Sequence, residues 1–216
     1  VHPAMADAAA KTAPPVTPVA TPESAARPTI RVLADNAHAL AEQVRTCDAC
    51  DLHRTRQQAL WGQGSLPCQV LLITPQPNPD DDVAAQLLAG KSGELLQHML
   101  HAVGLNLAEV FLTSAVKCAP HLDVSASTTQ QQACWGFLDA QIHLAQAQAI
   151  VVLGGDHPDL AQQITAAHNH TPCWVLPHPA RLLRDAQHKR QAWQVLKQLR
   201  HHLNSGKQAR THTDPP

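Results

Sequence analysis

Four of the six cysteines in this 216-residue chain are spaced so that they could bind one metal centre together. Cys47 and Cys50 form a C-x-x-C pair ahead of the first apolar run. Cys118 follows the second apolar run, and Cys134 lies 16 positions further on. A C-x-x-C pair alone is compatible with redox chemistry, zinc binding or chance. Together the four favour a metal site, and their spacing leaves zinc, a [4Fe–4S] cluster and no metal open.

The composition indicates a globular chain without a membrane span. Hydrophobic residues make up 44% and charged residues only 15%, and the net charge of -1 indicates no particular partner. No apolar run reaches the ~18 residues of a transmembrane helix, and no secretory pattern opens the sequence. Six cysteines are too few for a disulfide scaffold, so we expect a cytoplasmic protein. We also expect a monomer. Cys68 and Cys173 stand in or beside apolar runs and are predicted to be buried small hydrophobes.

The chain is predicted to contain one domain with two tails. Residues 1–29 are rich in Pro and Ala, lack helical or strand periodicity, and are expected to be disordered. A protein partner could dock on this tail. The domain is expected to span 30–204, followed by a polar, disordered tail over 205–216.

Within the domain, short apolar runs alternate with amphipathic stretches. Strands are expected at 70–73, 110–113, 149–153 and 173–176, and helices at 83–103, 128–148, 156–167 and 189–203. Continuous apolar strands between helices predict a parallel sheet covered on both faces. Ligands of such sheets bind beyond the carboxyl ends of the strands. The loops to inspect are therefore 74–82, 114–118, 154–157 and 177–184.

Several motifs resemble one known family. They include Cys47-Asp-Ala-Cys-Asp-Leu52, Trp61-Gly-Gln-Gly64, Gly90-Lys-Ser-Gly93-Glu-Leu-Leu96, Thr113-Ser-Ala-Val-Lys-Cys-Ala-Pro120, Leu153-Gly154 and His178-Pro-Ala-Arg-Leu-Leu-Arg184. In order and cysteine spacing, they are similar to the iron–sulfur uracil-DNA glycosylases, family 4 of the uracil-DNA glycosylase superfamily. The resemblance implies an α/β/α sandwich around a four-stranded parallel sheet, a [4Fe–4S] cluster, and DNA as the partner. The implied cluster ligands are Cys47, Cys50, Cys118 and Cys134.

The resemblance also implies which residues meet DNA. The loop that carries His178 approaches DNA in this family, so Arg181, Leu182 and Arg184 are expected to contact or wedge the strand. Lys117, beside a cluster cysteine, is expected to touch a phosphate or to tune the cluster. Half of the Lys and Arg residues lie between 181 and 210, and the alternative for this run is an ordinary solvated helix face.

The base pocket departs from the family pattern. Where the family has its pocket Glu, this chain has Pro75, followed by Gln76; the Phe that stacks on uracil is Leu88, and the Asn that reads the base is Ser114. Loss of an acid–base group costs about 10²–10⁴ in rate, and loss of a stacking ring costs ~1–3 kcal/mol. Only His178 matches the family's pocket. These changes predict weak, altered or absent activity.

If the chain is active, Asp81 or Asp82 with His178 are the predicted catalytic residues. The reaction would hydrolyse the N-glycosidic bond of uracil or another damaged base in DNA repair. The alternative for the acidic residues is that they solvate a loop and cap the helix that follows. The alternative for the chain is a non-enzymatic module that binds DNA or a protein partner, with the cluster as a structural element.

Overall fold

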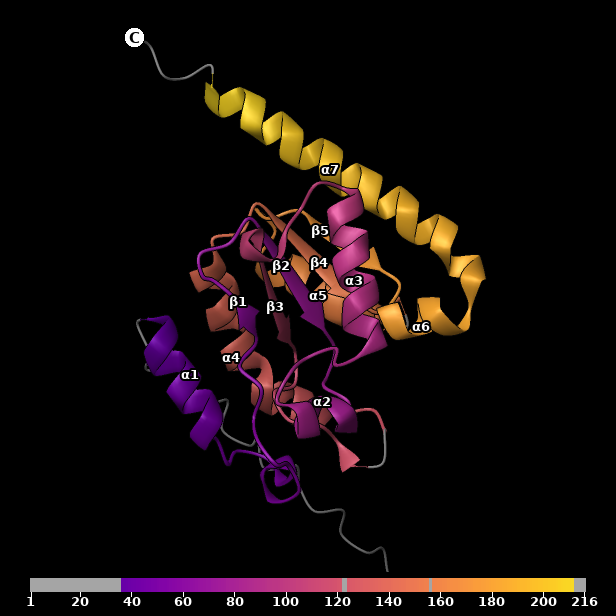
Figure 1. Ribbon diagram of the computed structural model, residues 1–216. Coiled ribbons are helices and arrows are strands. Elements are labelled where there is room, and N and C mark those ends of the chain that lie inside the picture. The colour runs from indigo at the N-terminus through magenta and orange to yellow at the C-terminus, as the bar shows by residue number, and fades with distance from the viewer. Residues whose placement is uncertain (1–35, 122–123, 156, 212–216) are drawn as a thin grey trace, which may run out of the picture.

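The computed structural model describes residues 36–121, 124–155 and 157–211 (Figure 1). Its sheet contains the four predicted parallel strands, β2 (Val70–Thr74), β3 (Val110–Ser114), β4 (Ala149–Leu153) and β5 (Cys173–Leu176). The strand order is β1-β3-β2-β4-β5, so β2 lies at the centre. The two-residue β1 (Gln63–Gly64), which the sequence analysis did not predict, pairs antiparallel with β3 at one edge.

The sheet is covered by helices on both faces, which confirms the three-layer α/β/α prediction. Val70 and Leu72 of β2 pack into a core with α3, α6 and α7. Leu71 and Ile73 point to the other face and pack with α4 and α5. This alternation of a continuously apolar strand is what a sheet buried on both sides requires.

The described residues contain seven helices and three short 3₁₀ turns. No helix in the described part of the chain is long and apolar enough to cross a membrane. The helices are α1 (Ala37–Thr46), α2 (Pro79–Ala84), α3 (Lys91–Ala102), α4 (Thr128–Ala145), α5 (Pro158–Ala167), α6 (Pro179–Arg184) and α7 (Lys189–Thr211), and the 3₁₀ turns are Asp51–Arg54, Leu107–Glu109 and Ala186–His188.

The continuous helix predicted over 83–103 is wrong. The chain forms α2 and then breaks before α3, with Ala85 and Leu88 in the left-handed region at φ 58° and 53°. The carboxylate of Asp81 accepts a hydrogen bond from the backbone N–H of Ala89 and so ties the break to α2. Gly93 at the start of α3 packs closely on this turn, because a Cβ there would lie 2.4 Å from the Leu88 carbonyl oxygen.

The two ends of the chain compare differently with the predicted boundaries. The tail predicted over 1–29 lies outside the described residues. At the other end, α7 continues to Thr211 and so extends beyond the boundary predicted at residue 204. Its inner face carries Ala192, Leu196, Leu199 and Leu203, which join the core of α3 and α6. The division into domain and tails therefore stays a prediction.

A smaller third core lies beside the sheet, between α1 and the start of α4. Leu40 and Val44 of α1 pack there against Val116 and Phe137. All four of the predicted ligand cysteines border this core. It is separate from the two cores that cover the sheet.

Candidate functional site

A cavity of about 470 Å³ opens beyond the carboxyl ends of β2, β4 and β5. This is the position at which ligands of open α/β sheets bind, and its volume falls in the ~300–1,000 Å³ range of small-molecule sites. Three of the four loops that the sequence singled out contribute to it. The lining residues are Thr74, Pro75, Gln76, Pro77, Asn78, Pro79, Asp80, Asp81, Ser125, Leu153, Gly154, His157, His178, Ala180, Arg181 and Arg184.

His178 stands at the edge of this cavity because it is the N-cap of α6, with Pro179 as the first helical residue. Its Nδ1 accepts a hydrogen bond from the backbone N–H of Ala180 at 3.2 Å. Its Nε2 lies 3.3 Å from the hydroxyl of Thr74 at the end of β2. Because Nδ1 is an acceptor here, Nε2 is the nitrogen that can carry the proton. The imidazole is thus oriented with its donor at the cavity.

The two predicted catalytic carboxylates are buried and bound to backbone N–H groups. Asp81 accepts from Asn78 and Ala89, and with Asn78 it forms the capping box of α2. Asp82 accepts from the N–H groups of Gln57 and Gln58 and does not line the cavity. Burial raises the pKa of Asp81, although its backbone hydrogen bonds oppose the shift. These contacts fit the capping alternative, and the catalytic role stays a prediction.

The four residues at the changed pocket positions fall into two groups. Pro75 and Gln76 line the cavity, and the Gln76 side chain is held by the carbonyl oxygen of Val124 and the N–H of Ala126. Leu88 and Ser114 are buried and do not line it. The hydroxyl of Ser114 has no hydrogen-bond partner among the described residues. The structure therefore brings the first pair, but not the second, to the cavity wall.

Two further side chains at the cavity, His157 and Asp80, belong to loops that the sequence analysis singled out but are not among its predicted catalytic residues. Both line the cavity, His157 from the loop after β4 and Asp80 from the first turn of α2. His157 had a usable signal, because it follows the Gly154-Gly155 stop of a predicted strand. The sequence could not show that this loop faces the loop of His178.

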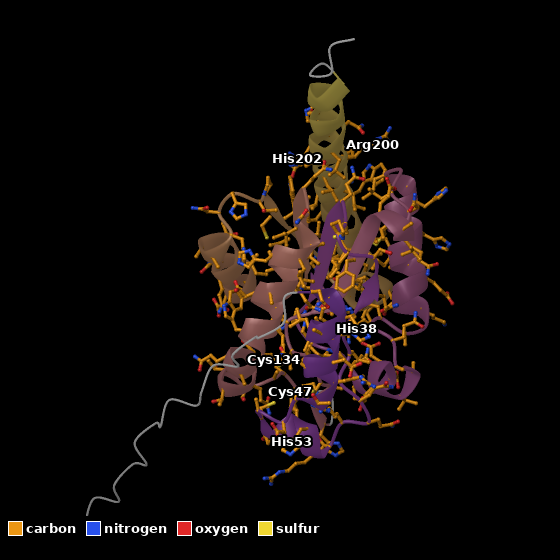
Figure 2. The ribbon with its side chains drawn as sticks, turned by 90° about the vertical axis from the view of Figure 1, so that its left-hand side faces the viewer. His38, Cys47, His53, Cys134, Arg200 and His202 are labelled. Carbon is orange, nitrogen blue, oxygen red and sulfur yellow. The ribbon has the colours of Figure 1, made fainter. Side chains whose placement is uncertain are left out.

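The basic run after residue 181 divides between two places. Arg181 and Arg184 line the cavity. Leu182 is buried in the core under α6 and is not exposed as a wedge. The remaining basic residues lie along α7, whose Arg200 lies at the opposite end of the molecule from Cys47 (Figure 2). Contact of Arg181 and Arg184 with DNA stays a prediction.

The four predicted ligand cysteines come from three segments that meet at the third core. Figure 2 shows Cys47 and Cys134 toward the same end of the molecule, and both border that core with Cys50 and Cys118. Among these described thiols, no three sulfur atoms lie within 4.8 Å of one another. Burial raises the pKa of the Cys50 and Cys118 thiols, and that of Cys134 to about 12.

Two cations face these thiols. The guanidinium of Arg56 donates to Cys118 Sγ at 3.1 Å. Lys117 is enclosed, and its ammonium donates to the Thr113 hydroxyl, the Ser114 carbonyl oxygen and the Gln141 side-chain oxygen. Burial lowers the pKa of Lys117 to about 7, although the thiols of Cys134 and Cys118 oppose the shift. An enclosed ammonium with these partners is not placed to touch a phosphate, so its predicted influence on the thiols is the better supported of the two roles.

The chain is thus an α/β/α sandwich with a polar cavity beyond its strand ends and a group of thiols beside the sheet. A sequence model described as the uracil DNA glycosylase superfamily matches residues 61–197. The chain belongs to this superfamily, and the resemblance inferred from its motifs is confirmed.

Its curated relatives are of the predicted type. The type-4 uracil-DNA glycosylases of Pyrobaculum aerophilum and Thermotoga maritima are each 31% identical over 115 residues, or 53% of this chain. That of Saccharolobus solfataricus is 30% identical over 121 residues, or 56% of this chain. The matches cover 59%, 60% and 56% of those proteins, so the chain spans less than two thirds of their length.

One solved structure with a related shape is the crystal structure of wild-type Pedobacter heparinus SMUG2. It has a TM-score of 0.43 and is 12% identical, and the match covers 65% of this chain and 76% of that one.

Proposed function

We propose that this protein is a uracil-DNA glycosylase-like repair protein whose base pocket has been rebuilt. It binds DNA as a monomer, takes a flipped uracil or other damaged base into the cavity, and hydrolyses the N-glycosidic bond weakly or with altered specificity. The observation that carries this proposal is the position of His178, whose Nε2 faces the cavity beside Thr74. The names of its curated relatives support uracil-containing DNA as the first substrate to test.

In the proposed reaction, His178 stabilises the leaving base. Negative charge grows on a base oxygen as the glycosidic bond breaks, and a preorganised donor lowers the free energy of that transition state. Nε2–H of His178 is such a donor, because the backbone N–H of Ala180 occupies Nδ1 and fixes the ring. Arg181 and Arg184 at the cavity are placed to hold the flanking phosphates.

Activation of the attacking water has less support from the cavity lining than stabilisation of the leaving base. For this reason we propose weak or altered activity. The position of the family's pocket Glu is Pro75, which has neither a carboxylate nor an N–H donor. Pro77 and Pro79 also line the cavity and also lack N–H groups. The carboxylates left to activate a water are Asp81, which is bound to the backbone, and the exposed Asp80.

We further propose that Cys47, Cys50, Cys118 and Cys134 hold a [4Fe–4S] cluster. Four thiols bordering one core are a suitable donor set. The distances between the sulfur atoms favour a cluster of several metal ions over a single zinc ion. A tetrahedral zinc ion needs sulfur atoms about 3.8 Å apart, whereas no three of these sulfur atoms lie within 4.8 Å of one another. The cluster ties α1, the segment after β3 and α4 together, and metal binding deprotonates thiols whose pKa burial raises.

A second candidate function is DNA or partner binding without catalysis. The observation that favours it is the engagement of Asp81 and Asp82 by backbone N–H groups, which leaves these buried carboxylates in a capping role. In that case the cluster acts as a structural element only. The N-terminal tail that could dock a protein partner lies outside the described residues.

Single-turnover release of uracil from single- and double-stranded oligonucleotides separates the two functions. We expect slow release by the wild-type protein and a loss of about 10²-fold or more in His178→Ala. The matched control is His53→Ala, which removes a half-buried histidine outside the cavity and is expected to keep the wild-type rate. Tight, salt-dependent DNA binding without release of uracil or of other damaged bases would support the second function instead.

A further inference from the structure

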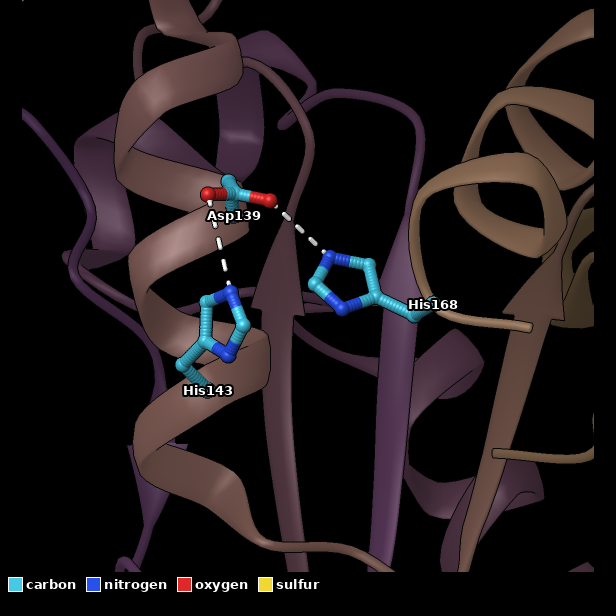
Figure 3. Close-up of side chains that lie close together, drawn as sticks. All are labelled: Asp139, His143 and His168. Atoms are coloured by element: carbon cyan, nitrogen blue, oxygen red, sulfur yellow. Dashed lines mark hydrogen bonds and ion pairs between the residues drawn. The ribbon is translucent and has the colours of Figure 1, made fainter. Parts of the chain in front are cut away.

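A second group of potential ligands lies away from both the cavity and the thiols. Asp139 and His143 are on α4, and His168 ends α5. Figure 3 shows one oxygen of the Asp139 carboxylate directed to each of the two imidazole rings. These helix ends lead into the amino ends of β4 and β5, whereas the cavity lies beyond the carboxyl ends of the strands. The group therefore belongs to neither site described above.

The three side chains converge through their ligand atoms. Asp139 Oδ1 lies 3.0 Å from His168 Nε2, and Asp139 Oδ2 lies 3.9 Å from His143 Nε2. The two imidazole rings meet edge to face with centroids 4.9 Å apart. All three ligand atoms lie within 4.8 Å of one another. At 3.9 Å the contact to His143 is too long for a hydrogen bond, so hydrogen bonding does not explain why this ring points to the carboxylate.

Sequence and packing explain why these groups meet. Asp139 and His143 are four residues apart on a helix, which places them on one face. The backbone N–H of His168 closes the end of α5 on the Ile164 carbonyl oxygen, and its side chain is 2% exposed. Burial lowers the pKa of His168, although Asp139 opposes the shift. The Nε2–H of His168 donates to the Asp139 carboxylate, so a metal that binds Nε2 takes the place of this proton, which moves to Nδ1 through solvent.

We propose that Asp139, His143 and His168 bind a divalent transition-metal ion, with Zn²⁺ as the ion of choice. Two imidazoles and one carboxylate form a donor set of intermediate softness, which suits zinc. It does not suit Mg²⁺ or Ca²⁺, because both ions prefer oxygen ligands only. Ligand atoms around a tetrahedral zinc ion lie about 3.3 Å apart, so the site closes by a movement of about 1 Å. His143 can make it, because its side chain is 66% exposed. Three protein ligands leave a fourth position for water.

The bound ion would cross-link α4 to the turn before β5. Figure 3 shows two of the three ligands on α4 and the third on the turn that follows α5. A ligand that binds only the folded chain stabilises it by mass action. Zinc is therefore expected to raise the melting temperature of the protein through this site, independently of DNA or of the thiols.

Titration of Zn²⁺ into the purified full chain, by calorimetry and by thermal unfolding, tests the site. We expect His143→Ala to lose one zinc equivalent or to bind it at least about tenfold more weakly, since even outer ligand partners contribute that much to metal sites. The matched control is His98→Ala, which removes an exposed histidine from α3 and is expected to bind as the wild type does. His143 is the variant of choice because its exposed side chain can be removed without opening the core.

The thiols could also bind zinc, so the ligand nitrogens are observed directly. In imidazole ¹⁵N NMR spectra, Zn²⁺ is expected to shift the Nε2 signals of His143 and His168 and to leave that of His98 unchanged. If zinc binds with equal stoichiometry and affinity to the wild-type and His143→Ala proteins, the proposal is wrong. Absence of any shift at His143 and His168 at saturating zinc overturns it as well.

Discussion

The third core, which contains or borders Cys47, Cys50, Cys118 and Cys134 and is called the thiol core below, lies on the same α/β/α fold as the cavity. The two regions hold their polar groups in different ways. At the thiol core, Lys117 and three of the four cysteines are buried, and the ammonium donates to three oxygen atoms of the protein. At the cavity, three prolines form part of the wall, and polar side chains that include His157, His178 and Arg184 also line it. The cysteines that match the family motif lie in the first region, and two of the four changed residues, Pro75 and Gln76, lie in the second.

This difference indicates that the two regions respond to different constraints. A change at the thiol core would leave a buried charge or a buried acceptor unpaired, which costs stability in the whole chain. A change at the open cavity wall exchanges one solvated side chain for another and alters binding or rate instead. We therefore expect substitutions at the thiol core to act on stability and substitutions at the cavity to act on chemistry.

The largest effect is expected from Cys118→Ser. If the thiol core holds a cluster, this variant loses the bound iron and its visible absorbance. Its free energy of unfolding should fall by about 3–4 kcal/mol, as expected for loss of a tightly bound group. The control is Cys173→Ser, a cysteine of β5 outside the core. Iron retained in Cys118→Ser, or lost equally in the control, would contradict the assignment.

Lys117→Met comes next. It removes an enclosed ammonium and the hydrogen bond that this group donates to the Ser114 carbonyl oxygen, while Gln141 Oε1 keeps the hydroxyl of Thr113 as a donor. Unsatisfied buried acceptors cost about 1–3 kcal/mol, which denaturant unfolding will measure. Lys197→Met, on the exposed side of α7, is the control and should change the free energy of unfolding by less than about 0.5 kcal/mol. Equal effects of the two variants would show that the enclosed ammonium is not a stabilising group.

Pro75→Glu tests the cavity itself. It places a carboxylate where the family motif has one, at a half-buried position in the cavity wall. We expect the single-turnover rate of uracil release to rise about tenfold, which is short of the ~10²–10⁴ of a fully positioned acid–base group. The control is Pro79→Glu, which adds the same charge at an exposed lining position. If both variants release uracil equally fast, Pro75 does not limit the activity.

Arg184→Ala tests where DNA runs. The loss of one phosphate contact at the cavity should lower the slope of log affinity against log salt by about one. Arg200→Ala, at the far end of the molecule on α7, should leave the slope unchanged (Figure 2). The reverse result would place the DNA along α7 and away from the cavity.

The smallest effect is expected from Asp81→Asn and depends on pH. Burial raises the pKa of Asp81 above the usual carboxyl value of 3.8. A carboxyl whose pKa is higher in the folded chain binds its proton more tightly there, so its contribution to stability is lost as pH rises through that value. Asparagine does not titrate. The difference in free energy of unfolding, wild type minus variant, should therefore fall as pH rises above ~4, and a difference that rises would contradict the raised pKa.

Much of the fold could be predicted from the sequence because its signals are local. Four short apolar runs such as Val70–Ile73 indicate strands whatever their position in the fold. Helices between successive strands require a parallel sheet. The break at Ala85 was missed, because the apolar pattern of 83–103 continues through it at helical spacing. The break reflects tertiary packing, because Leu87 and Leu88 are buried in the core while Val83 stays 68% exposed.

The site was predicted in part for the same reason. The sequence alone determined the strand-end loops, the thiols and the place of His178, since each follows from motif and chain order. Only the tertiary structure decided which groups are enclosed. In the tertiary structure, the carboxylates of Asp81 and Asp82 accept hydrogen bonds from backbone N–H groups, and Lys117 is enclosed. The fold also brings His157 to the cavity and His168 to Asp139. Burial and partnership depend on residues far apart in the chain, and no local pattern encodes them.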